Sequence, residues 1–171
     1  PVDIVKFTAA YAATLPQRKP HPNGQRYKVV VGKDARLSGD MVEQLVVGTL
    51  AGCGIDVVKC GFASTPTTEM AVLFAQADGG IILTASHNPR QWNALKLLND
   101  KGEFLTAVEG QAVLDLAEAE DFTFAEVDNL GNIEEEDFTD KHLDAVLALP
   151  AVDVEAIREA HFTVVVGAVN S

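Results

Sequence analysis

The sequence predicts an α/β fold, a three-layer α/β/α sandwich with a mostly parallel sheet and one antiparallel strand. Short apolar runs alternate with longer amphipathic segments, which is typical of parallel strands joined by helical crossovers. The run 81–83 is uninterrupted, as expected of a strand buried on both faces. The apolar run 94–98 follows too soon for a helical crossover, so we expect it to pair antiparallel.

The N-terminal segment is expected to form a covering helix, a loop and the first strand. Apolar residues at loosely helical spacing predict a helix over 2–15 that stops before Pro16. The Pro, Asn and Gly residues of 16–24 are typical of a surface loop, in which we expect His21 to be solvated. The apolar run 27–31 then predicts a strand.

A helix and a second strand are expected after the first strand. The helix begins near Ser38 or Asp40, because Asp40 and Glu43 have the spacing of a cap and its N3 acid. The next strand is expected over 55–58. This order places the polar loop 32–39 at the carboxyl end of a strand.

Another helix and strand complete the parallel part of the predicted sheet. Thr65 followed by Pro66 is typical of an N-cap with proline at the first helical position. We therefore expect a helix from there to about Ala77, followed by a strand over 80–84 that lies parallel to the earlier strands.

The last third of the chain is expected to be mainly helical. Thr106 and Glu109 have the spacing of a capping box at the start of an amphipathic helix. The acidic run 134–137 is expected to begin another helix, since negative charge suits a helix N-terminus, and this helix ends at Pro150. Three apolar side chains on it are expected to be buried: Leu143, Val146 and Leu147.

Pro150 is expected to divide the chain into two domains. Residues 1–149 would form the first domain, and residues 150–171 a linker and the first strand of a second domain. A short helix near 153–160 would lead to that strand, over 162–166. Because the first residue is not Met and the chain stops soon after this strand, we expect the sequence to be part of a longer protein.

Composition restricts the class of partner and the compartment. Thirteen Lys and Arg against twenty-five Asp and Glu give a net charge of −12, which repels both nucleic acids and anionic membranes, so a small-molecule partner is expected. The sequence shows neither a run of about 18 apolar residues nor a signal peptide, so we expect a cytoplasmic protein. Cys53 and Cys60 are too few for a disulfide framework, and their wide spacing does not match a zinc knuckle, so free thiols are expected.

Polar residues gather directly after the strand predicted over 80–84. Open α/β sheets bind ligands at the carboxyl ends of their strands, so we place the chemistry in this loop. Its polar side chains are those of Thr84, Ser86, His87 and Asn88.

The residues alone leave three interpretations of Ser86. A Ser–His nucleophile pair is disfavoured because neighbours in an extended chain point to opposite faces, so His87 is poorly placed to deprotonate Ser86, and no nucleophile elbow is present. Alternatively, Ser86 carries a phosphoryl group, for which Asn88, Lys96 and Arg36 could supply donors. The third interpretation is an ordinary turn whose side chains bond their own backbone, and general considerations favour it.

Two motifs change this weighting. The segment 84–89, TASHNP, followed ten residues after Ser86 by Lys96, closely resembles the phosphoserine loop of the α-D-phosphohexomutases. That family includes phosphoglucomutase, phosphomannomutase and phosphoglucosamine mutase. The segment 31–39, VGKDARLSG, resembles the first strand-end loop of the same family. The sequence departs from the family pattern at Ala94, where glycine is usual.

The resemblance implies a multidomain enzyme of which this chain covers most of the first domain, with the segment from Val164 as the opening strand of the second. It implies a mutase that moves a phosphoryl group between the 1- and 6-positions of a hexose or hexosamine phosphate, by way of a bisphosphosugar that also acts as activator. Mg²⁺ would bind the phosphate on the serine together with ligands outside this chain. We therefore expect this chain to be inactive without the remaining domains.

By position, the resemblance implies that Ser86 carries the phosphoryl group and, through it, binds the metal. Lys96 would be the cation beside it, and a lysine in an apolar strand also loses hydration, which suits it to proton transfer. The alternative is an edge-strand lysine whose ammonium reaches water. His87 and Asn88 would shape the phosphate pocket, with Arg36 as a further donor.

The sugar cannot be chosen from these residues, because glucose, mannose and glucosamine phosphates would be distinguished outside this segment. Overall similarity slightly favours phosphoglucosamine mutase. The rival interpretation, from another functional class, is a non-catalytic domain that binds a sugar phosphate or a protein on the same scaffold.

Overall fold

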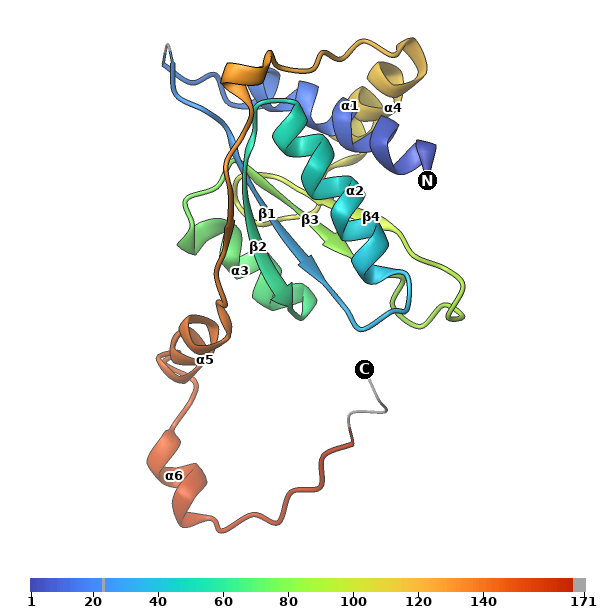
Figure 1. The fold of residues 1–171 in the computed structure, drawn as a ribbon. Helices are drawn as coiled ribbons and strands as arrows, with labels where there is room; N and C mark the ends of the chain where they lie inside the picture. Colours follow the sequence, from blue (N-terminus) through green and yellow to red (C-terminus); the bar gives the residue numbers. More distant parts are fainter. Residues whose placement is uncertain (23, 168–171) are drawn as a thin grey trace.

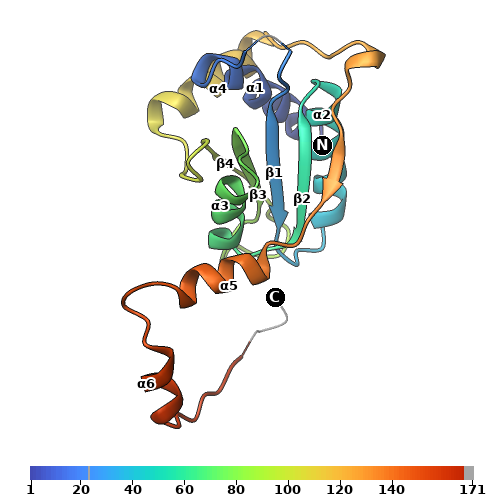
Figure 2. The ribbon, with the colours of Figure 1, turned by 90° about the vertical axis from the view of Figure 1, so that its left-hand side faces the viewer.

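The chain forms one mixed sheet with helices on both faces (Figure 1). The structure is a computed structural model that describes residues 1–22 and 24–167. The strand order is β4-β3-β1-β2-β5, which Figure 2 shows across the sheet. All neighbouring pairs are parallel except β3 and β4, which are antiparallel. The strands are β1 (Lys28–Lys33), β2 (Asp56–Phe62), β3 (Gly79–Leu83), β4 (Leu95–Leu98) and β5 (Ile133–Glu135).

Helices cover the two faces of the sheet as separate layers, which confirms the predicted three-layer sandwich (Figure 2). The core on one face joins the sheet to α1, α2 and α4, and the core on the other joins it to α3. The predicted capping box of Thr106 and Glu109 is present at the start of α4. The helices are α1 (Val2–Arg18), α2 (Gly39–Gly52), α3 (Thr65–Phe74), α4 (Ala107–Ala119), α5 (Thr139–Leu147) and α6 (Val154–Glu159), with a short 3₁₀ helix at Val127–Asn129.

The central strand β3 serves both cores. Ile81 and Leu83 belong to the core under α1 and α2, whereas Ile82 belongs to the core under α3, as the alternation of side chains along a strand requires. Every residue of β3 is buried, as its uninterrupted apolar run predicts. Leu83 pairs with Leu95 in β4, which confirms the antiparallel pairing predicted from the short connection.

Two predictions for the N-terminal region are wrong. α1 continues past Pro16, because a proline in the last turn removes only one intrahelical hydrogen bond. His21 is not solvated: its side chain is 8% exposed, its ring stacks on Tyr27 at 4.3 Å, and its Nε2 lies 2.8 Å from Asp78 Oδ1. His21 is therefore buried, although its segment has the composition of a surface loop, because its ring contacts the buried Asp78 carboxylate at the amino end of the sheet.

The capping residues of two helices differ from prediction. α2 begins at Gly39 with Ser38 as its N-cap position, which confirms the predicted start, but Asp40 and Glu43 do not form its cap, because both carboxylates accept hydrogen bonds from Lys33 Nζ, at 2.6 and 2.8 Å. At α3 the N-cap is Ser64, one residue before Thr65. In both cases a neighbouring polar group takes the hydrogen bond that the spacing pattern assigned to another residue. At α2 this group is the Lys33 ammonium, and at α3 it is the Ser64 hydroxyl, which accepts the N–H of Thr67.

The region around α5 differs most from prediction. The acidic run 134–137 begins no helix; Ile133–Glu135 form β5, parallel to β2, and α5 starts at Thr139. Phe138 is fully buried, stacks on Phe74 of α3 at 6.4 Å between ring centroids, and so anchors this segment. Three side chains predicted to be buried on α5 are 39–53% exposed: Leu143, Val146 and Leu147.

Beyond α5 the chain leads away from the sheet (Figure 1). The short helix predicted near 153–160 is confirmed as α6. The strand predicted over 162–166 is wrong: these residues are exposed and have no regular structure, because no strand of the described residues pairs with them. The rest of that predicted segment, 168–171, lies outside the described residues, and the division at Pro150 stays a prediction. In the described parts of the chain, no helix combines the length and the apolar character needed to cross a membrane.

Candidate active site

Two loops meet at the carboxyl end of the sheet, where β1 and β3 end side by side. Lys33 pairs with Leu83 at the ends of these strands. The backbone N–H of Asp34 then donates to the carbonyl of Leu83 at 3.1 Å. The loop over 34–38 consequently lies against the loop over 84–92, as the sequence predicts for strand-end segments of a parallel sheet.

Ser86 adopts a left-handed backbone conformation, with φ of 52°. For a residue with a Cβ, such a conformation costs of order 1–3 kcal/mol and persists only where neighbours hold it. Thr84 Oγ1 holds it on one side, because it accepts the Ser86 N–H at 3.1 Å and donates to Asp34 Oδ2 at 2.6 Å. Thr84 is buried, whereas Ser86 is exposed, so the Ser86 hydroxyl is accessible from solvent.

Arg36 holds the same loop through backbone carbonyls. Its Nε donates to Asp34 Oδ2 at 3.2 Å, and its side chain is only 11% exposed. A guanidinium has five N–H donors, so all of them are used, and Arg36, which we expected to bind phosphate, binds the loop in this structure. The carbonyls that accept are those of Ser86 (2.5 Å), Asn88 (3.0 Å), Pro89 (3.1 Å) and Trp92 (2.9 Å).

His87 and Asn88 flank the serine in the same turn. Ser86 Oγ and His87 Nδ1 are 3.5 Å apart, a distance at the limit of hydrogen bonding. The expectation that these side chains point to opposite faces is wrong, because the left-handed Ser86 interrupts the extended chain. The N–H of Asn88 donates to the carbonyl of Ala85 at 3.0 Å, which closes the turn.

Lys96 does not join this group. It lies in β4 opposite Ile82, and its Nζ lies 5.7 Å from the centroid of the Phe104 ring. The structure thus brings four of the predicted site residues together and leaves Lys96 on the neighbouring strand. The four are Arg36, Ser86, His87 and Asn88.

A hollow of about 390 Å³ opens beside Ser86, which is within the size range of small-ligand sites. The residues that line it do not form a magnesium site on their own. Asp34 is the only carboxylate of the described residues that lines the hollow, and both of its oxygens already accept hydrogen bonds. Across 1–22 and 24–167, no three His, Cys, Asp or Glu side chains are grouped so as to bind a metal ion. The lining residues are Asp34, Ala35, Arg36, Leu37, Ser86, Asn88 and Arg90.

Asp34 and Thr84 are site residues to which the sequence reasoning gave no role. Besides the bonds already described, Asp34 Oδ1 accepts the backbone N–H of Arg36 at 3.1 Å. This is the spacing of an Asx turn, in which a carboxylate bonds the amide two residues later, and it is the signal that could have identified Asp34. A second link joins the loops, because Asn93 Nδ2 donates to Ser38 Oγ at 3.1 Å.

An ion-pair network lies beside the site at the ends of β1 and β2. Burial alone would lower the pKa of Lys33, but its hydrogen bonds with Asp40 and Glu43 outweigh burial and raise the pKa. Lys59 Nζ similarly donates to Glu135 at 2.5 Å. These charges are neutralised within the network, so Lys33 acts as a structural cation.

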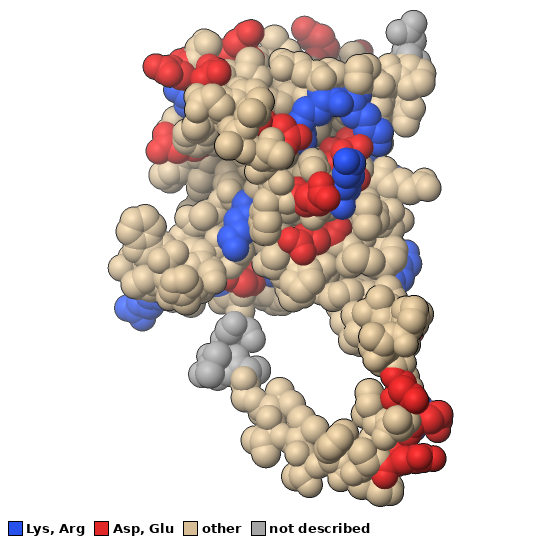
Figure 3. All heavy atoms as spheres, turned by 180° about the vertical axis from the view of Figure 1, so that it is seen from behind, with Lys and Arg blue, Asp and Glu red and all other residues tan. Residues whose placement is uncertain are grey.

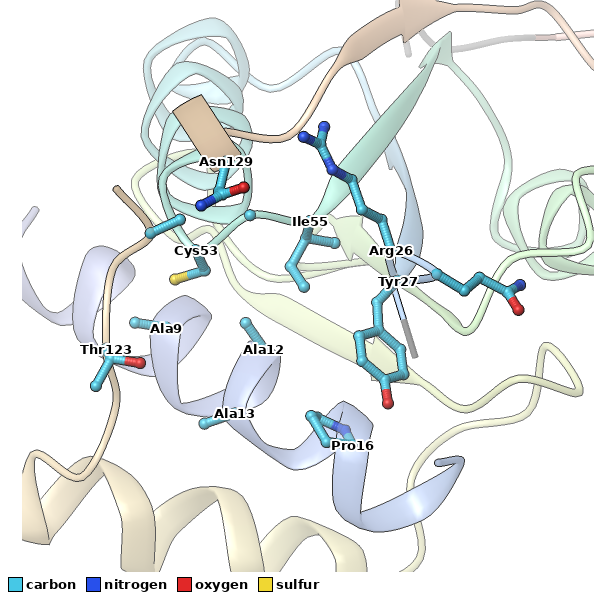
Figure 4. Close-up of a pocket in the computed structure, with 14 residues that line it drawn as sticks. Ala9, Ala12, Ala13, Pro16, Arg26, Tyr27, Cys53, Ile55, Thr123 and Asn129 are labelled. Atoms are coloured by element: carbon cyan, nitrogen blue, oxygen red, sulfur yellow. The ribbon is translucent and has the colours of Figure 1, made fainter. Parts of the chain in front are cut away.

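A second hollow, of about 450 Å³, lies at the opposite end of the sheet, between α1 and the segments that lead into β1 and β2 (Figure 4). Small and apolar side chains such as Ala9, Ala12 and Ile55 form much of its wall (Figure 4). Burial raises the pKa of the Cys53 thiol there to about 11, so it stays protonated at neutral pH. Cys60 is also a free thiol, and burial raises its pKa to about 12. Neither cysteine is an activated nucleophile.

Figure 3 shows how charge is distributed on one face of the molecule. Lys and Arg side chains lie among acidic ones there without forming a continuous basic patch, and acidic side chains gather at the projecting end that carries α6.

Comparison with known proteins gives a consistent result. A family model for "Phosphoglucomutase/phosphomannomutase, alpha/beta/alpha domain I" matches residues 1–124. A phosphoglucomutase/phosphomannomutase from Thermococcus kodakarensis is 38% identical over 146 residues, which are 85% of this chain and 32% of the relative. A phosphoglucosamine/phosphogalactosamine mutase from Sulfurisphaera tokodaii is 32% identical over 150 residues, 86% of this chain and 32% of the relative.

A solved structure supports the fold. The phosphoglucomutase/phosphomannomutase family protein from Burkholderia thailandensis superposes with a TM-score of 0.69 at 23% identity, over 85% of this chain and 31% of that one. The chain thus spans about a third of the length of the relatives that it matches.

Proposed function

Because the chain belongs to the phosphoglucomutase/phosphomannomutase family, we propose that the full-length protein transfers a phosphoryl group between the 1- and 6-positions of a hexose or hexosamine phosphate through Ser86. The observation that supports this most directly is the state of Ser86. Its backbone N–H and C=O are both bound, by Thr84 and Arg36, while its exposed hydroxyl lines the hollow and has, among the described residues, only the long 3.5 Å contact with His87. A fixed backbone with a free side chain suits a group that must meet a substrate repeatedly in one geometry.

The proposed cycle has two transfers. In the first, a hydroxyl oxygen of the sugar phosphate attacks the phosphorus on Ser86, the bond from phosphorus to Ser86 Oγ breaks, and the hydroxyl proton leaves to a base. The freed Ser86 Oγ takes up a proton, and the products are a bisphosphosugar and an unmodified serine. In the second transfer, Ser86 Oγ loses its proton to a base and attacks the phosphorus of the other phosphoryl group. The bond from that phosphorus to the sugar oxygen breaks, the sugar oxygen takes up a proton, and the products are the isomeric sugar phosphate and a phosphoserine. Such transfers depend mainly on positioning and charge neutralisation.

The other site residues take supporting roles in this proposal. In the tautomer whose Nδ1 carries no proton, His87 would accept the proton of Ser86 Oγ, which lies 3.5 Å from Nδ1. Asn88 lines the hollow and would donate to a phosphate oxygen. Lys96 would neutralise charge beside the phosphoserine, which requires its flexible side chain to turn away from the Phe104 ring.

Mg²⁺ belongs to this proposal as an ion held through the Ser86 phosphate and by carboxylates outside this chain. It would supply positive charge to the transferring phosphoryl group. Since this chain covers about a third of its relatives and has no metal site among its described residues, we propose that it needs the rest of the protein for activity. A bisphosphosugar would restore the phosphoserine whenever the intermediate escapes.

The experiment uses the full-length protein. Intact-mass analysis should find a fraction with one phosphoryl group that is missing from Ser86→Ala, and Ser86→Ala should lose at least about 10³-fold in kcat, because it removes the acceptor oxygen. Glucose, mannose and glucosamine phosphates are assayed in parallel, since the relatives differ in the sugar that they are named for. The 171-residue chain, assayed beside it with Mg²⁺ and bisphosphosugar, should show no turnover.

A non-catalytic domain that binds sugar phosphates is the alternative. It predicts that full-length protein binds a sugar phosphate with equal affinity before and after Ser86→Ala, that Ser86 stays unmodified when bisphosphosugar is added, and that no isomerisation occurs. That combination of results would replace the mutase proposal.

A further inference from the structure

We propose that Asp34 is a positioning residue for phosphoryl transfer, because its one carboxylate anchors both groups that hold the backbone of Ser86. The inference rests on the proposed role of Ser86 as phosphoryl carrier. It assigns to Asp34 no contact with the phosphate or the sugar.

The geometry connects Asp34 to Ser86 by two routes. On one route, Asp34 Oδ2 accepts from the Thr84 hydroxyl at 2.6 Å, and the oxygen of that hydroxyl accepts the Ser86 N–H at 3.1 Å. On the other, Asp34 accepts from Arg36 twice, at Nε (3.2 Å) and at the backbone N–H (3.1 Å), and Arg36 Nη2 donates to the Ser86 carbonyl at 2.5 Å. The two routes reach the N–H and the C=O of the same residue.

The two routes act on a strained residue. Ser86 has φ of 52°, which a non-glycine residue adopts only when its surroundings impose it. Release of either backbone group would let φ return to the negative range, and this rotation would change the direction of the Cα–Cβ bond. The position of Ser86 Oγ therefore depends on hydrogen bonds that it does not itself make.

A carboxylate is suited to this position for two reasons. Both oxygens are used as acceptors, so an asparagine, which has one oxygen and an NH₂ group, would place a donor against a donor at Thr84 or at Arg36. In addition, the Arg36 guanidinium is only 11% exposed, and a largely desolvated cation is held best by an opposite charge. Asp34 is itself tied to β3 through its N–H bond to the carbonyl of Leu83.

The consequence for catalysis is specific. Asp34 would affect the placement of the reacting oxygen, and a displacement of about 1 Å can cost on the order of 10²-fold in rate. The sugar would be bound by other groups, so KM for the sugar phosphate should change little. A residue that served stability alone would also lower the apparent kcat at unchanged KM, because it lowers the folded fraction, so kcat is expressed per mole of folded protein, with the folded fraction measured by urea unfolding.

The test compares variants of the full-length protein. Asp34→Asn and Thr84→Val should each lower kcat by roughly 10- to 100-fold with KM within about twofold. Thr84→Ser, which restores the hydroxyl, should recover most of the loss caused by Thr84→Val. The double variant Asp34→Asn/Thr84→Val should lose less than the product of the single losses, because the two residues share one route. Asp115→Asn, an equal change of charge on the exposed face of α4, is the control.

Each outcome decides between the two proposals. If wild type turns over, Ser86→Ala is inactive, and both Asp34→Asn and Thr84→Val keep the wild-type kcat, the inference about Asp34 is overturned while the mutase proposal stands. Losses that multiply independently, or a Thr84→Ser variant as slow as Thr84→Val, would also overturn it. If wild type neither turns over nor carries phosphate on Ser86, the mutase proposal fails, and the inference fails with it. Should Asp34→Asn fail to fold, the Thr84 pair decides alone.

Discussion

Replacing Arg36 with lysine should loosen the loop around Ser86 without unfolding the domain. The guanidinium makes five hydrogen bonds, whereas an ammonium has three donors, so at least two bonds are lost. The loop faces solvent, and water can satisfy part of what is lost, so we take about 1 kcal/mol for each bond. Two or three lost bonds then correspond to about 2–3 kcal/mol, or a roughly 30- to 150-fold larger open fraction of the loop.

Hydrogen exchange of the backbone amides of Asn88 and Trp92 measures this opening, because each donates to a carbonyl three residues earlier in the loop. In Arg36→Lys, the protection of these two amides against exchange should fall roughly 30- to 150-fold, while the protection of the β3 amides stays unchanged. The matched control is Arg90→Lys, since Arg90 lies in the same loop and, among the described residues, has no hydrogen-bond partner. Equal protection of Asn88 and Trp92 in the two variants would refute the clamp, as would a loss of protection that extends into β3.

Two further predictions concern stability. Phe138→Ala should lower the free energy of unfolding by about 3–5 kcal/mol, because the ring is fully buried against Phe74. Leu143→Ala, on the exposed face of α5, should lower it by less than about 1 kcal/mol. Urea unfolding of the two variants and wild type measures both changes. Hydrogen bonds from the Thr106 N–H and hydroxyl lower the pKa of Glu109 below its usual 4.5, so its stabilisation is present above that pH and is lost as pH falls through the lower folded pKa. The stability difference between wild type and Glu109→Gln should therefore be larger at pH 7 than at about pH 3, and a difference independent of pH would contradict this assignment.

The sequence predicts those parts of the fold that depend on local pattern. The buried β3, the antiparallel β4 and the capping box of α4 follow from an apolar run, a short connection and a fixed spacing of residues. β5 could not be predicted in the same way, because a three-residue exposed segment that contains two glutamates becomes a strand only where the edge of β2 pairs with it. The burial of Phe138 is likewise decided by contact with α3.

The site was predictable in position and less so in function. Ser86 follows a buried strand in a recognisable motif, so its location could be predicted from the sequence. Arg36 could not be identified as a clamp, because the carbonyls that it binds face it only after β1 and β3 have ended side by side. The family resemblance implies that Lys96 lies beside the serine, and the strand register sets it opposite Ile82.

The charges around Ser86 argue that this loop is completed by other parts of the protein. Arg36 and Asp34 neutralise each other, and every N–H of Arg36 is already used. Lys33 is neutralised within its own network. Of the described residues that line the hollow, Arg90 is then the cation left for a phosphoserine of about −1.5 to −2 charge, in a chain whose net charge is −12. A transferring phosphoryl group requires more positive charge than this, which supports the proposal that a metal ion and the remainder of the protein supply it.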